Sequence, residues 1–97
     1  MCKSKIFAEI LKAVSRETEV SAAQILSGCK QTEIVDARSI LIRILIDMGF
    51  YPDQIASYMN RSSASVRYLI SHYSQREKTN KMIGIYMQNI RKHIENI

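Results

Sequence analysis

The apolar residues of this chain recur every three to four positions, which is the spacing that places side chains on one face of a helix. The pattern predicts helices over residues 4–17, 22–26, 34–48, 52–59, about 63–73 and 80–97. Residues 34–48 are apolar around most of the helical circumference, so we expect this segment at the centre of a bundle. The predicted fold class is all-α, a bundle of five or six helices.

Residues suited to helix ends mark the borders of these segments. We expect Ser4 to cap the first helix, Gly28 to end the second and Gly49 to end the third in a left-handed conformation. Pro52 fits the first position of the fourth helix, where its missing N–H has no partner to lose. With 3 Gly and 1 Pro in the chain, helices joined by short connectors are favoured over long loops.

The bulk composition indicates one domain without a membrane segment. The 97 residues are 46% hydrophobic, a normal value for a globular protein with a thin core. No apolar run reaches ~18 residues, and Glu9 and Lys12 interrupt any secretory signal. Cys2 and Cys29 are too few for a disulfide framework, so we expect free thiols in a reducing cytoplasm.

The positive charge of the chain lies in its last third. Residues 1–60 hold seven Lys and Arg and seven Asp and Glu, whereas residues 61–97 hold seven bases and two acids, which gives the whole net charge of +5. A one-sided basic surface suits a polyanion such as DNA. The plainer alternative is a solvated, lysine-rich surface.

Residues 52–71 have the pattern of a helix-turn-helix. Ala56 is small enough for two helices to cross closely, and Asn60 tolerates the left-handed conformation that the turn needs. Ser62 or Ser63 can cap the second helix. Its outward residues would then enter the major groove of DNA. These residues are Ser62, Ser63, Ala64, Ser65, Arg67 and Tyr68.

A wider resemblance points the same way. It is carried by Val20–Ser27, Ile34–Ile40, Pro52–Ala56 and Arg61–Val66. These stretches resemble the C-terminal DNA-binding domain of the bacterial replication initiator DnaA, which has a Trp-repressor-like helix-turn-helix fold. The similarity covers about 60 of the 97 residues, from about residue 10 to residue 70, and leaves 71–97 as a helical extension of a single domain.

The resemblance implies a role for each matching residue. Ser62, Ser63, Ala64 and Ser65 would face base edges, and Arg61 would lie at the entrance to the groove. Arg38 would contact the phosphate backbone, and Lys30 falls in a loop where the family has basic residues that reach DNA. That loop holds only one Lys and one Glu, so we expect the salt-dependent affinity to come mostly from phosphate contacts of Arg38, Arg61, Arg67 and Arg76.

The chain departs from the family at the base-reading positions. Ser62 and Ser63 replace an aspartate–histidine pair, and Ala64 replaces a threonine. Since hydroxyls bond to donors and acceptors alike, they specify bases weakly. The resemblance implies a bacterial, phage or mobile-element protein near the nucleoid. Its role would lie in replication control, transcription control or mobile-element maintenance.

Other chemistry finds little support in the sequence. No nucleotide-binding P-loop is present, and no spacing suggests a catalytic triad, so we expect neither an enzyme nor a cofactor. Cys2, Cys29, His72 and His93 lack the spacing of a zinc site.

Two further questions stay open. The last helix can pack on the first, which we favour, or form the seam of a dimer. The rival function is a protein-interaction bundle that kept the fold, lost DNA contact and binds a replication or regulatory protein.

Overall fold

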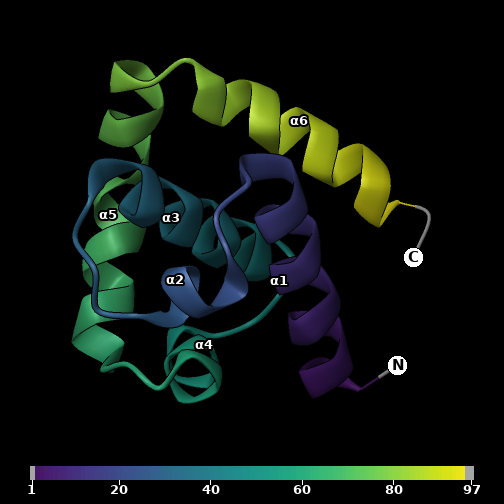
Figure 1. Cartoon of the computed structure of the whole chain (residues 1–97). Coiled ribbons are helices and arrows are strands. Elements are labelled where there is room, and N and C mark those ends of the chain that lie inside the picture. Colours follow the sequence, from purple (N-terminus) through teal and green to yellow (C-terminus); the bar gives the residue numbers. More distant parts are fainter. Residues whose placement is uncertain (1, 96–97) are drawn as a thin grey trace.

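The computed structural model describes residues 2–95, and these residues form helices and connectors without a strand. The helices are α1 (Lys3–Thr18), α2 (Ala22–Leu26), α3 (Thr32–Asp47), α4 (Pro52–Met59), α5 (Ser63–Thr79) and α6 (Met82–Ile94). Figure 1 shows their arrangement. The predicted all-α fold is confirmed.

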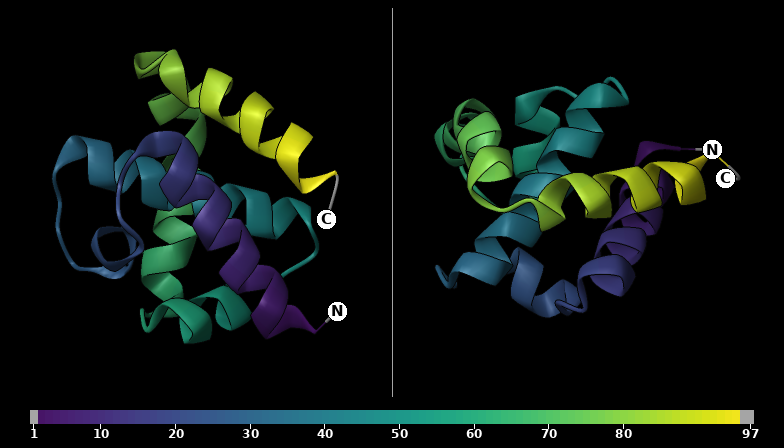
Figure 2. Two further views of the ribbon diagram at one scale, coloured as in Figure 1. Left: turned by 45° about the vertical axis from the view of Figure 1, so that its right-hand side comes forward. Right: turned by 90° about the horizontal axis from the view of Figure 1, so that it is seen from above.

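Helix α3 is the centre of the bundle. It contacts each of the other five helices, and 11 of its 16 residues are buried. In Figures 1 and 2, α5 lies on one side of α3 and α1 on the other. The nearly uniform apolar surface of this segment therefore has the central position that its composition predicts.

Helix α6 closes the bundle on the side away from α4. It packs on α1, α3 and α5, and it buries Ile83, Met87 and Ile90. The favoured packing of the last helix on the first is thus confirmed, while Ile97 lies outside the described residues. Within residues 2–95, no helix combines the length and apolar character needed to cross a bilayer.

Two predicted helix starts are wrong by one or two residues. Helix α1 begins at Lys3 with Cys2 in the cap position, so Ser4 lies inside the helix and does not cap it. Helix α3 begins at Thr32, two residues before its first apolar residue. Glu33 then lies in the first turn, where a negative charge is favourable next to the helix dipole.

The two interior glycines at helix ends behave differently. Gly49 has a φ of 96°, and the N–H of Phe50 bonds to the carbonyl of Leu45 at 3.0 Å, as in a Schellman motif. Gly28 is not among the residues with positive φ, and α2 already ends at Leu26 with an extended Ser27 after it. Gly49 ends its helix as predicted, and Gly28 does not.

These glycines form a matched pair for a stability test. A Cβ added at either position meets no heavy atom within 4 Å, so substitution changes only the backbone preference. We expect Gly49→Ala to lower the free energy of unfolding by about 1–2 kcal/mol, because alanine resists a positive φ. Gly28→Ala should leave it unchanged or raise it by up to ~1 kcal/mol. Urea denaturation measures both, and equal effects would contradict the assignment.

Candidate nucleic-acid interface

Helices α4 and α5 form the predicted helix-turn-helix. Asn60 follows α4 in the left-handed conformation, with φ 54° and ψ 49°, and the N–H of Arg61 bonds to the carbonyl of Ala56 at 2.9 Å. Ala56 is only 4% exposed where the two helices meet. The small residue and the left-handed turn residue therefore have the positions that the sequence predicts.

The serines at the start of α5 are engaged by the protein itself. Ser62 caps the helix, since its Oγ accepts a hydrogen bond from the N–H of Ser65 at 3.1 Å. The Oγ of Ser65 in turn lies 3.1 Å from Nε of Arg61, which donates to it. Ser63 donates its hydroxyl hydrogen to Oδ1 of Asp53 at 2.6 Å. The hydroxyls that the resemblance assigns to base edges thus already have partners.

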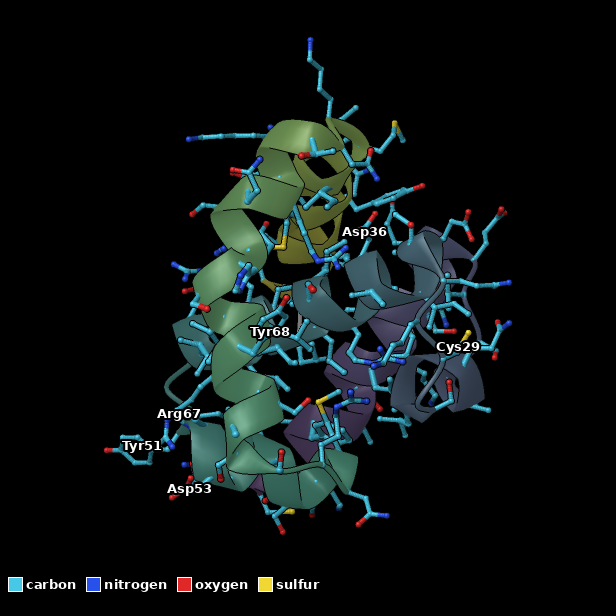
Figure 3. All side chains as sticks on the ribbon, turned by 90° about the vertical axis from the view of Figure 1, so that its left-hand side faces the viewer. Cys29, Asp36, Tyr51, Asp53, Arg67 and Tyr68 are labelled. Carbon is cyan, nitrogen blue, oxygen red and sulfur yellow. The ribbon has the colours of Figure 1, made fainter. Side chains whose placement is uncertain are left out.

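The most open side chains on this part of α5 are Ala64, Arg67 and Tyr68. Tyr68 is 59% exposed, and its ring stacks on that of His72 with centroids 4.0 Å apart. The side chain of Arg67 is 61% exposed. Figure 3 looks onto this helix, with Tyr68 near its middle and Arg67 nearer its start. A polar and aromatic helical face is therefore open to a partner.

A cleft of about 380 Å³ runs beside α5, and we call it the basic cleft. It is lined by Lys30, Val35, Arg38, Arg61, Ser65, Tyr68, Leu69 and Arg76. The four cations come from the α2–α3 connector, α3, the turn before α5 and α5 itself. The fold therefore brings together positive charges that are up to 46 residues apart in the sequence, between Lys30 and Arg76.

Arg38 does not have the position that a phosphate contact requires. It is 2% exposed, with Nε donating to the carbonyl of Ile25 at 2.8 Å and Nη2 donating to that of Ser27 at 2.6 Å. Burial, followed by the neighbouring Arg61, lowers the pKa of the guanidinium. Arg38 binds the end of α2 in place of the glycine cap expected there, so its predicted contact with DNA is corrected.

Arg61 also donates to the end of α2. Its Nη1 donates to the same Ser27 carbonyl at 3.1 Å, so the carbonyl accepts from two arginines. The side chain stays partly exposed and also lines a second hollow between α2 and the start of α5. Arg61 therefore lies between the two hollows, next to the start of α5, and Lys30 is exposed on the neighbouring connector.

Asp36 is an acid that the sequence does not single out. It is 6% exposed, and its carboxylate pairs with Nη1 of Arg76 at 2.8 Å and accepts from Nδ2 of Asn80 at 3.1 Å. These contacts bind the far end of α5 to α3. Part of the Arg76 charge in the basic cleft is consequently neutralised.

Asp53 is the second residue that the sequence reasoning missed. Besides accepting from Ser63, its Oδ1 lies 3.6 Å from Nη2 of Arg67. Asp53 and Ser63 are ten positions apart on different helices, so no periodicity links them. In the sequence, only the helix-turn-helix pattern indicates that Asp53 and Ser63 can meet, because it brings the first turns of both helices to one end of the motif.

Comparison with known proteins adds no family assignment. No protein-family model matches the chain, and no curated protein matches it. Among residues 2–95, no group of three or more His, Cys, Asp and Glu could hold a metal ion. The function must therefore be argued from the interface itself.

The buried arginine yields a stability prediction. Arg38→Ala should lower the free energy of unfolding by about 2–4 kcal/mol, because it leaves the buried Ile25 carbonyl without this donor, removes one of two donors from the Ser27 carbonyl and opens a cavity. Arg38→Lys should recover only part of this loss, since an ammonium lacks the planar fork of the guanidinium. Urea denaturation measures the effect, with exposed Arg16→Ala as the control. A loss below about 1 kcal/mol for Arg38→Ala would contradict the assigned role.

Proposed function

We propose that this protein binds double-stranded DNA by placing the first half of α5 in the major groove. The observation that carries the proposal is the open face of α5 next to the basic cleft, with Arg67 and Tyr68 both more than half exposed. A helix is ~10–12 Å wide with its side chains, and the major groove is ~12 Å wide. The start of α5 therefore has a suitable width to enter the major groove and contact base edges.

Phosphate contacts come from the cations beside the helix. Lys30 and Arg61 line the basic cleft on one flank of α5, where a DNA strand that borders the groove would run. Such contacts fix the position of the protein on the duplex and make its affinity depend on salt. The net charge of +5 favours the encounter with DNA.

Base preference is expected to come from few side chains. The hydroxyls of Ser62 and Ser65 are engaged within the turn, and Ala64, Arg67 and Tyr68 are the exposed side chains beyond it. Apolar atoms of Ala64 and Tyr68 can contact thymine methyl groups, and Arg67 can donate to guanine. The resemblance to the DnaA C-terminal domain supports a role in replication or transcription control or in mobile-element maintenance.

One observation favours the rival function. Asp53 pairs with Arg67 at 3.6 Å, and an acid next to the reading helix opposes the approach of phosphates. A helical bundle that binds a regulatory protein through α5 would tolerate this acid. DNA binding remains the better account because the basic cleft flanks the same helix.

Lys30 is the exposed cation of the basic cleft and would contact one phosphate. Lys30→Ala should weaken binding to every duplex about three- to tenfold and reduce the slope of log affinity against log salt by about one, because one phosphate contact is lost. Fluorescence anisotropy with a short labelled duplex of mixed sequence measures both quantities.

The control removes the same charge elsewhere. Lys12 lies on α1 with its side chain 71% exposed, across α3 from α5, so Lys12→Ala should leave affinity nearly unchanged (Figure 2). If the wild-type protein binds no duplex, or binds without dependence on salt, the proposal fails and the protein-interaction bundle takes its place.

A further inference from the structure

The first turns of α4 and α5 share a charged cluster of Asp53, Ser63 and Arg67. Oδ1 of Asp53 accepts from the Ser63 hydroxyl at 2.6 Å and lies 3.6 Å from Nη2 of Arg67. The side chains of Asp53 and Arg67 are 75% and 61% exposed. Figure 3 shows both at the same end of the helix-turn-helix. The cluster is therefore held together by the fold and remains open to a ligand.

Stability explains this cluster only in part. Asp53 lies in the first turn of α4, where a negative charge is favourable next to the helix dipole, but this does not require its contact with Arg67. Exposed ion pairs contribute little to folding because solvent screens them and two side chains lose freedom. In a protein that binds DNA only through phosphates, a carboxylate at this place would weaken binding by repulsion. Because Asp53 offers acceptors next to the donors of Arg67, a matching partner has hydrogen-bond donors next to acceptors.

A base pair in the major groove offers this combination. Guanine presents the acceptors O6 and N7, and its paired cytosine presents the N4 amino donor. Arg67 supplies donors and Asp53 supplies acceptors, since a carboxylate has about four lone-pair positions and Ser63 occupies one. The Ser63 bond also fixes Asp53 beside the reading helix.

We propose that Asp53 and Arg67 together read one G·C base pair, with Arg67 on guanine and Asp53 on cytosine N4. This inference rests on the proposed DNA binding and makes Asp53, on α4, a residue that determines specificity. The Asp53 carboxylate also disfavours complexes with DNA sites in which no base amino group faces it. Asp53 thus weakens binding to random sequence while it strengthens discrimination.

The test begins with selection of bound sites from a random duplex pool, followed by anisotropy on the selected site and on a version with A·T at the G·C pair. The wild-type protein should select a G·C pair at one position and prefer it about tenfold. Asp53→Ala should reduce that preference to about twofold or less, and it should bind random duplex more tightly than the wild-type protein.

Two variants separate charge from readout. Asp53→Asn keeps an acceptor oxygen, so it should retain part of the preference while binding to random duplex rises. Arg67→Ala should lose the preference at the same base pair. Glu9→Gln, on α1, removes one negative charge away from the interface and should change neither quantity. Thermal melting establishes that each variant is folded.

The outcomes distinguish this inference from the proposed function. If the wild-type protein binds no duplex, the proposed function fails and the inference fails with it. If the wild-type protein binds DNA without base preference, or if Asp53→Ala keeps the preference, DNA binding stands and the reading role of Asp53 is overturned.

Discussion

The arrangement of the interface depends on one buried cation, Arg38 of α3. Its guanidinium donates to the carbonyls of Ile25 and Ser27 at the end of α2, and Arg61 donates to Ser27 from the turn before α5. The central helix, the short helix α2 and the helix-turn-helix therefore meet at a single carbonyl. Burying a guanidinium costs free energy unless its N–H groups have acceptors. The end of α2 must therefore stay next to Arg38.

A second contact holds the other end of α5. The carboxylate of Asp36 bonds to Arg76 and Asn80, so the end of α5 is joined to α3. The turn before α5 is held instead at Ser27, after α2, by Arg61. Val66, Leu69 and Tyr73 bury the face of α5 between these two points. The outer face of α5 is then presented on a fixed scaffold, which would limit the entropy lost if α5 binds DNA as we propose.

Local signals in the sequence predict most of the fold. Pro52 begins α4, Gly49 ends α3 in a Schellman motif, and Asn60 adopts the left-handed turn, because each of these preferences resides in the residue itself. The apolar pattern likewise predicts α3 at the centre. These features need no knowledge of distant contacts.

The errors at Gly28, Arg38 and Asp53 involve partners far apart in the sequence, whereas the two misplaced helix starts are local. Gly28 is a reasonable helix end by composition, yet Arg38, eleven residues beyond Ser27, satisfies the carbonyls that a glycine cap would serve. The same contact removes Arg38 from the predicted DNA surface. Asp53 escaped notice because its partners lie on the next helix. An arginine or an aspartate looks the same in sequence whether it binds a ligand or a neighbouring helix.

The length of α5 has a consequence for how the chain can be divided. The resemblance ends near residue 70, but α5 continues to Thr79 without a break. A fragment cut at that border would lose Arg76 and Asn80, the two partners of the Asp36 carboxylate. It would also uncover the surface of α1 on which α6 packs. The segment after residue 70 is therefore packed into the same bundle as the rest of the chain, and its removal would take away part of that bundle's core.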